Sequence, residues 1–262
     1  MEEHKITNRH GLKIHIQVDT PTDPCKLVFI AHGQKGSLKQ KHIQAFTDAF
    51  IENGFRVVRF DATHALGESE GDVQAVTYDT YISDLEDVID WARTQDWFTV
   101  PFVLCGHSMG AQSTAWYAEQ HPDEISLLAP MAPTINYKLW SSTRTEEDLR
   151  SWQKLGYEEG ISRSTGKSVR VGWQVAESLK KFDILTGANR LTMPVLNIVG
   201  EFDQPCPVTN QEIFMDAVAS ANKTLVIISG LEHSYRDEAS QEYSESLGQV
   251  TQIIDGWLKR NV

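Results

Sequence analysis

The sequence predicts an α/β fold, with a mostly parallel, twisted sheet that carries helices on both faces. Short apolar runs alternate with longer amphipathic segments along most of the 262 residues, which is the pattern of repeated strand–helix–strand units. Several of the apolar runs are continuous, as in strands that are buried on both faces. Hydrophobic residues make up 40% of the chain, enough for one sizeable core. We therefore expect a single domain over residues 1–262.

The individual elements follow from local patterns. Residues 4–8 and 12–18 predict a hairpin, because two short strand-like runs flank a turn that contains glycine. The helices are predicted from apolar side chains three or four residues apart, such as Ile43, Phe46 and Phe50. After the hairpin we expect strands at 26–31, 55–60, 102–105, 125–129, 194–199 and 225–228, and helices at 40–53, 78–93, 109–120, 210–220 and 242–259.

One stretch breaks this alternation. Residues 133–172 contain no clean strand pattern and mix polar with aromatic residues. A long insertion between two core elements is more often functional than idle, so we expect a small cap within the same domain. Its aromatic side chains are candidates for substrate binding, and packing of the cap against the body is an equally good interpretation. These side chains are Trp140, Trp152, Tyr157 and Trp173.

A nucleophile is predicted where Gly106-His107-Ser108-Met109-Gly110 follows one strand and opens a helix. This Gly-x-Ser-x-Gly pattern forms a turn so tight that side chains at both flanks would clash. The turn strains the backbone of Ser108 and exposes its hydroxyl, while the Met109 N–H at the helix start can donate to an oxyanion. The alternative is a chance pentapeptide at a strand–helix turn.

Two further residues complete a nucleophile–base–acid set. Asp203 lies just past the strand at 194–199, where the sites of open α/β sheets gather. His233 lies in the loop after the strand at 225–228. The chain order Ser, Asp, His differs from the orders in chymotrypsin and subtilisin and suits a strand–turn–helix elbow. Glu201 is a weaker alternative acid, and a turn-forming aspartate or a solvated loop histidine are the plainer interpretations.

A second oxyanion donor is expected in the loop after the strand at 26–31. His32-Gly33-Gln34 follows that strand, and Gly33 lets the backbone turn close to a substrate. The Gln34 N–H is the candidate donor. A simple strand-ending turn is the alternative.

Charge and cysteine content limit the partners. The net charge of −12 disfavours binding to nucleic acids or to anionic membrane surfaces. The sequence shows neither a span of membrane length nor a secretory signal, and its three cysteines (Cys25, Cys105 and Cys206) do not form a disulfide framework or a zinc pattern. We expect a reduced, cytoplasmic protein without a metal or cofactor. Its expected partner is a small-molecule substrate, and the sequence leaves open whether the chain forms a homodimer.

The chain resembles the α/β-hydrolase superfamily over nearly its whole length. Within it, the chain is similar to the branch of bacterial feruloyl/cinnamoyl esterases and monoacylglycerol-lipase-like enzymes. The resemblance rests on the following residues: His32-Gly33, Arg59-Phe60-Asp61, Gly67-Glu68-Ser69-Glu70-Gly71, the serine elbow, Leu127-Leu128-Ala129-Pro130, and the Gly-x-x-Asp and Gly-x-x-His segments that end in Asp203 and His233. The resemblance implies the α/β-hydrolase fold, a small cap inserted after the Ala129-Pro130 strand, and ester substrates.

The chain departs from this branch in two loops. The family usually has Gly-His-Gly between the aspartate and the serine of one loop, but here residues 62–67 read Ala-Thr-His-Ala-Leu-Gly, with one residue more. Residues 204–207 are unusually rich in proline. Both loops could border the pocket, so the resemblance leaves the substrate open.

We therefore expect a serine hydrolase that cleaves small carboxylic esters through an acyl-enzyme on Ser108. A thioesterase or an amidase/peptidase would use the same three residues on a different leaving group, and a perhydrolase would replace water by peroxide. A non-catalytic binding protein of the same fold is the alternative from another class, but it would need none of the three residues.

Overall fold

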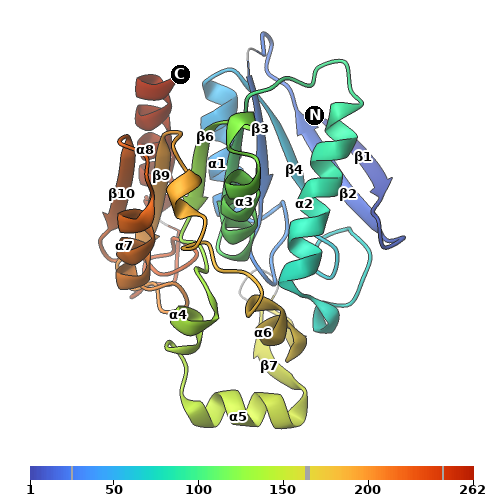
Figure 1. The fold of residues 1–262 in the computed structure, drawn as a ribbon, viewed down its shortest axis with the longest axis vertical. Coiled ribbons are helices and arrows are strands. Elements are labelled where there is room, and N and C mark those ends of the chain that lie inside the picture. The colour runs from blue at the N-terminus through green and yellow to red at the C-terminus, as the bar shows by residue number, and fades with distance from the viewer. Residues whose placement is uncertain (25, 163–165, 244) are drawn as a thin grey trace.

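The computed structural model in Figure 1 describes residues 1–24, 26–162, 166–243 and 245–262. Within these residues, eight strands form one sheet in the order β1-β2-β4-β3-β5-β6-β9-β10. β2 pairs antiparallel with β1 and β4, and the other neighbours are parallel, so the predicted mostly parallel sheet is confirmed. The strands are β1 (Glu2–Thr7), β2 (Lys13–Asp19), β3 (Lys26–Ala31), β4 (Phe55–Phe60), β5 (Phe102–His107), β6 (Ile125–Met131), β9 (Val195–Gly200) and β10 (Lys223–Ile228).

Helices cover both faces of this sheet, as predicted (Figure 1). Successive side chains of a strand point to opposite faces. In β3, Phe29 joins the core under α2 (Tyr78–Arg93) and α3 (Met109–Gln120), while Ile30 joins the core under α1 (Lys41–Glu52) and α8 (Ser246–Asn261). The buried core therefore has two halves, one on each side of the sheet. The helices of the body are α1 (Lys41–Glu52), α2 (Tyr78–Arg93), α3 (Met109–Gln120), α7 (Val208–Ala217) and α8 (Ser246–Asn261), with short 3₁₀ turns η1 (Val73–Ala75), η2 (Pro122–Glu124) and η3 (Ala188–Arg190).

The segment between β6 and β9 projects from one end of the sheet (Figure 1). It contains α4 (Tyr137–Ser141), α5 (Glu146–Leu155), β7 (Tyr157–Ile161), β8 (Ser168–Gly172) and α6 (Gln174–Leu179). Residues 163–165 of the expected cap lie outside the described residues. α5 begins where the Thr145 hydroxyl accepts from the Asp148 N–H, and it ends at Gly156, whose φ of 79° suits glycine.

The expectation that residues 133–172 lack strands was wrong. β7 and β8 pair antiparallel in a separate two-stranded sheet. Only β8 carries a period-2 pattern, in which buried Val169 and Val171 alternate with exposed Ser168 and Arg170. β7 is largely polar and outside the core, so apolar alternation could not reveal it.

No described helix combines the length and the apolar character that a membrane span requires.

Candidate active site

The turn between β5 and α3 holds Ser108 in a strained conformation. Its φ of 56° and ψ of −117° lie in a region that residues other than glycine rarely adopt. The flanking glycines are required by close packing. A Cβ at Gly106 would lie 2.6 Å from the Gly110 carbonyl oxygen, and a Cβ at Gly110 would lie 2.4 Å from the carbonyl oxygens of Ala31 and His32. The sequence therefore folds into the elbow that its glycine spacing predicts.

Asp203 and His233 meet because the two strands that precede them, β9 and β10, are parallel neighbours. His233 Nδ1–H donates to Asp203 Oδ2 over 2.7 Å. Asp203 is buried, and its Oδ1 accepts from the Cys206 N–H over 2.7 Å. The carboxylate is thus fixed by two hydrogen bonds, and it leaves His233 Nε2 free to accept a proton.

Glu201, the alternative acid, occupies a different environment. Its Oε2 accepts from the Ser229 hydroxyl and the Gly230 N–H, and these two hydrogen bonds hold the pKa of Glu201 below its usual value. The side chain is exposed and has no hydrogen bond to His233. The geometry therefore favours Asp203 as the residue that orients the imidazole.

Ser108 and His233 line a common cavity of about 250 Å³. In the described part of the chain no hydrogen bond joins the two residues in this conformation; the Ser108 hydroxyl instead contacts the Cys206 thiol. Hydrogen bonds of this kind often tighten only when a substrate binds. Burial and the nearby Asp203 raise the pKa of Cys206 well above its usual value, against the effect of Thr134 and Ser108, so the thiol stays protonated.

Gln34 and Met109, whose backbone N–H groups are the predicted oxyanion donors, both line the same cavity. Neither donates to a backbone carbonyl of the described residues. The Met109 group is available because the first residues of a helix have no carbonyl partner one turn before them. Both groups are therefore available to an oxyanion, which is the role the sequence predicts for them.

The direction of the Gln34 N–H is set by the carbonyl of Gly33. That oxygen accepts from the Tyr81 hydroxyl over 3.1 Å and from His32 Nδ1 over 2.8 Å. Because the peptide is planar and trans, fixing the carbonyl also fixes the opposite N–H. The Ala62 N–H donates to His32 Nε2 over 3.0 Å, which leaves the proton on Nδ1, and burial lowers the pKa of His32 and keeps it neutral.

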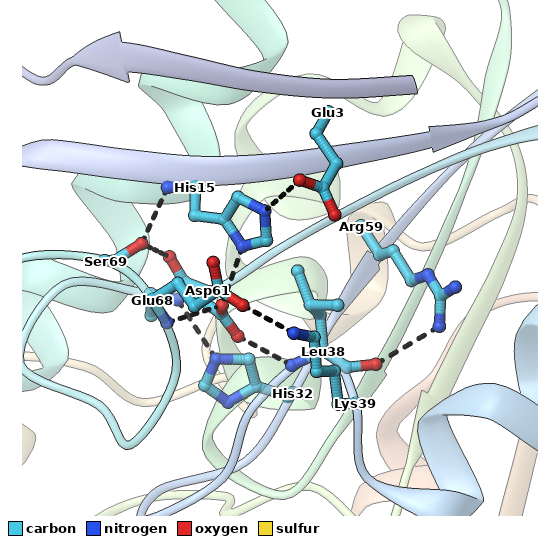
Figure 2. A network of polar contacts seen from close by, with 10 residues as sticks. Glu3, His15, His32, Leu38, Lys39, Arg59, Asp61, Glu68 and Ser69 are labelled. Atoms are coloured by element: carbon cyan, nitrogen blue, oxygen red, sulfur yellow. Dashed lines mark hydrogen bonds and ion pairs between the residues drawn. The ribbon is translucent and has the colours of Figure 1, made fainter. Parts of the chain in front are cut away.

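Asp61 ties the loop between β3 and α1, which contains Gln34 and Leu38, to the rest of the body, as Figure 2 shows. Its Oδ1 accepts from the Leu38 N–H, and its Oδ2 accepts from the Glu68 N–H and from His15 Nδ1, over 2.8, 2.8 and 3.0 Å. Burial alone would raise the pKa of Asp61, but these hydrogen bonds act in the opposite direction, and the pKa lies below its usual value, so the carboxyl stays ionised. Sequence reasoning used Asp61 only as a marker of resemblance and gave it no role.

The loop after Asp61 is shaped by the same carboxylate. A Cβ at Gly67 would lie 2.0 Å from Asp61 Cγ, so only glycine fits there. Arg59, near the end of β4, donates to the Leu38 carbonyl over 3.2 Å and so also holds the loop between β3 and α1 (Figure 2). The extra residue in 62–67 is therefore accommodated without loss of the glycine that the carboxylate requires.

His107, inside the elbow, connects Ser108 to the loop of His233. Its Nε2–H donates to the His233 carbonyl over 2.9 Å, and its ring lies 4.5 Å from that of His42. Burial, together with the charges of neighbouring groups, lowers the pKa of His42 to about 3 and that of His107 well below its usual value. Both rings are neutral. No sequence signal pointed to His42.

The predicted aromatic residues fall into two groups. Trp140 lines the Ser108 cavity. Trp152 is buried, and its Nε1–H donates to the Val171 carbonyl over 3.0 Å. Trp173 packs edge-on against Trp152, and Tyr157 stacks with Arg170. Those three residues do not line the cavity, so their contacts are those of the packing alternative.

One group of metal-ligating side chains comes together among the described residues. Donor atoms of Asp203, Cys206 and His233 lie within 4.8 Å of one another. The Asp203–His233 hydrogen bond already uses two of them, and the raised pKa of Cys206 disfavours the thiolate that binds metals. The arrangement is explained by acid–base chemistry alone.

Comparison with known proteins places this site in a family. The family model described as serine aminopeptidase, S33, matches residues 22–163, more than half of the 262 residues. The chain belongs to this family. As an S33 member it is a serine hydrolase of the α/β-hydrolase fold, and the fold expected from the sequence is confirmed.

Individual relatives and a structural neighbour match most of the chain. The monoacylglycerol lipase of Mycolicibacterium smegmatis is 26% identical, over 92% of this chain and 92% of its own, and the mouse monoglyceride lipase is 23% identical, over 91% and 84%. The structure of Est1E from Butyrivibrio proteoclasticus with ferulic acid bound superposes with a TM-score of 0.81 at 21% identity, over 98% of both chains. These proteins represent the branch that the sequence resembles.

Proposed function

We propose that this S33 hydrolase cleaves carboxylic esters with Ser108 as nucleophile, His233 as general base and Asp203 as the acid that orients it. The observation that carries the proposal is the hydrogen bond between buried Asp203 and half-buried His233, beside a strained serine at a helix start. A fixed acid, an imidazole with a free Nε2 and an exposed hydroxyl are the parts that acyl transfer needs. A binding protein would have no use for this arrangement.

The reaction follows from these positions. Ser108 Oγ attacks the ester carbonyl while His233 Nε2 takes the hydroxyl proton. Asp203 stabilises the imidazolium that forms, and the N–H groups of Gln34 and Met109 stabilise the oxyanion. His233 then protonates the leaving alcohol. Water, deprotonated by the same imidazole, hydrolyses the acyl-enzyme and restores Ser108.

The names of the relatives support esters, and not amides or thioesters, as the substrates of this chain. The curated relatives are named as monoacylglycerol or monoglyceride lipases, although the family takes its description from an aminopeptidase. The Ser108 cavity, at about 250 Å³, is smaller than most ligand sites, which measure roughly 300 to 1,000 Å³. We therefore expect a compact ester.

The role of the cap, the cellular location and the partner belong to the same proposal. Residues 133–172 form a cap within one domain over 1–262, and Trp140 contacts the substrate from it. The chain segment from β6 to β9 supports this role, because it projects from one end of the sheet and contributes Trp140 to the Ser108 cavity. We also propose a cytoplasmic location and a small-molecule partner; the net charge of −12 supports the latter, because it disfavours nucleic acids and anionic membrane surfaces.

Labelling with a fluorophosphonate and a matched substrate panel test the proposal. The purified protein and its Ser108→Ala variant are treated with the probe, and the labelled peptide is identified by mass spectrometry. We expect label on Ser108 alone and faster turnover of 4-nitrophenyl butyrate than of butyryl thioesters or butyryl anilides. Labelling of a different residue, or a preference for the anilide, would overturn the proposal.

A further inference from the structure

Two basic side chains line the Ser108 cavity in a chain whose net charge is −12. Lys35 and Arg144 line it, and the described residues of its wall include no aspartate or glutamate. A basic cavity in an acidic protein concentrates anions relative to the rest of the surface, because its walls focus the field. Neither residue is needed for the hydrolysis mechanism.

Arg144 is held rigidly at the boundary between the cap and the cavity. Its guanidinium lies over the rings of Trp140 and Trp152, 4.8 and 4.9 Å from their centroids. Its Nη1 donates to Glu158 Oε2 over 2.7 Å. Stacking on two indoles and one ion pair fix the plane of the side chain, so little conformational entropy is lost when a ligand binds to it.

The ion pair with Glu158 does not occupy all the N–H donors of the Arg144 guanidinium. Glu158 lies on β7 and lines an outer groove, whereas Arg144 lines that groove, the Ser108 cavity and an adjoining cavity that contains His233. A guanidinium has five N–H donors, and Glu158 occupies the donor of one nitrogen. The guanidinium therefore keeps donors for a second anion, and Arg144 lines the Ser108 cavity.

The charge of Arg144 also acts on another residue of the cavity, Tyr78. Tyr78 lines the same cavity. Burial raises the pKa of Tyr78, whereas a hydrogen bond with Thr134 and the charge of Arg144 act in the opposite direction. An anionic group placed between the cap and Ser108 would be stabilised by the same field.

We propose that the substrate is an ester that carries an anionic group, a carboxylate or a phosphate, bound by Arg144 with Lys35 contributing to the field. This inference rests on the proposed esterase function and specifies its substrate class. Guanidinium matches the planar geometry of both anions, and hydrogen bonds between two charged partners are about twice as strong as those between neutral ones. The plainer interpretation, in which Arg144 only joins α4, α5 and β7, predicts no preference for an anion.

Two matched substrate pairs test the proposal and locate the anion. On the acyl side, 4-nitrophenyl pentanoate is compared with mono-4-nitrophenyl glutarate, after subtraction of the rate with Ser108→Ala. On the alcohol side, 1-butyrylglycerol is compared with 1-butyrylglycerol 3-phosphate. We expect the anionic member of at least one pair to have about tenfold or greater kcat/KM at low ionic strength, as a charged hydrogen bond would give. Added NaCl should reduce this ratio, because it screens the attraction.

Variants separate a binding role from a structural one. Arg144→Gln should abolish the anionic preference mainly through KM, and Arg144→Lys should retain part of it, because the charge stays but the fork is lost. Arg150→Gln is the matched control: Arg150 is an exposed arginine of α5 paired with Glu146, and its loss should leave the ratio unchanged. Melting temperatures identify any variant that fails to fold. In that case the wild type alone tests the proposal, which requires that added NaCl reduce the preference for the anionic ester.

The outcomes distinguish this inference from the proposed function. If the wild type hydrolyses the neutral esters but prefers neither anionic partner, the anionic site is overturned and the esterase stands. An anionic preference that survives in folded Arg144→Gln also overturns it. If no ester of either pair is hydrolysed and Ser108 is not labelled by a fluorophosphonate, the proposed function itself fails.

Discussion

At the scale of single residues, the acid of the site is chosen by its environment and not by its distance along the chain. Asp203 and Glu201 are two residues apart in one loop, yet Asp203 is buried against His233 while Glu201 is exposed and paired with Ser229. The sequence favoured Asp203 from its place after β9, but only the structure shows what each carboxylate contacts.

Asp203→Asn is expected to lower kcat by about 10³ to 10⁴, because the amide favours the wrong imidazole tautomer. Glu201→Gln, the matched control, should change kcat far less. Steady-state kinetics with 4-nitrophenyl butyrate on both folded variants make the comparison. If the two effects came out reversed, Glu201 would be the acid.

Asp61 is a positioning residue, since it acts on the oxyanion through the loop that carries Gln34. Asp61→Asn removes one acceptor from the bonds to Leu38, Glu68 and His15, so the loop loosens. We expect kcat to fall by about tenfold to a hundredfold, less than the full loss of an oxyanion donor, with a small change in KM. Glu68→Gln breaks only an exposed ion pair with Lys39 and should leave kcat near wild type. Equal kcat values for the two variants would show that Asp61 has no such role.

At the scale of elements, the sequence predicted the strands of the body within a few residues, because most of them are buried on both faces and read as continuous apolar runs. The ends were less certain: the last helix begins at Ser246 instead of residue 242. The β7–β8 hairpin was missed because its stability comes from pairing outside the core. The Asp61 network escaped sequence reasoning for a similar reason, since it joins residues from β2, β4 and two loops.

The tryptophans of the cap should separate by function. Trp152→Ala should cost roughly 3 to 5 kcal/mol of stability, because a buried indole and its hydrogen bond to Val171 are lost, and it should leave the ranking of esters unchanged. Trp140→Ala should alter relative kcat/KM among acetyl, butyryl and cinnamoyl esters, because Trp140 lines the Ser108 cavity. Melting temperatures and the ester panel test both. A stability loss in both variants with an unaltered ester ranking would make the cap a structural cover.

At the scale of the whole molecule, the stability of the fold should depend on pH through Glu119. This carboxyl of α3 is buried, and neither of its oxygens has a hydrogen-bond partner among the described residues. Burial, reinforced by Asp183 and opposed by Arg190, raises its pKa to about 9. The side chain is therefore protonated in the folded protein at neutral pH but ionised in the unfolded chain.

The sign of this effect follows from linkage. A pKa that is raised on folding contributes stability that is complete below the unfolded value, near 4.5, and is lost as pH rises toward about 9. Within that window Glu119 should lower the free energy of unfolding by up to about 1.4 kcal/mol per pH unit relative to Glu119→Gln. Urea unfolding of both proteins from pH 5 to pH 9 measures the difference. A difference that does not change with pH would contradict the burial of an uncharged carboxyl.

The account as a whole depends on an acyl group passing through Ser108. The most direct measurement is acid quenching during turnover of 4-nitrophenyl butyrate, followed by mass spectrometry of the intact protein and its peptides. The account predicts one butyryl group on the peptide that contains Ser108, and its absence in folded Ser108→Ala, whose kcat should be lower by about 10⁴ to 10⁶. A butyryl group on another residue, or a folded Ser108→Ala with activity within tenfold of wild type, would contradict it.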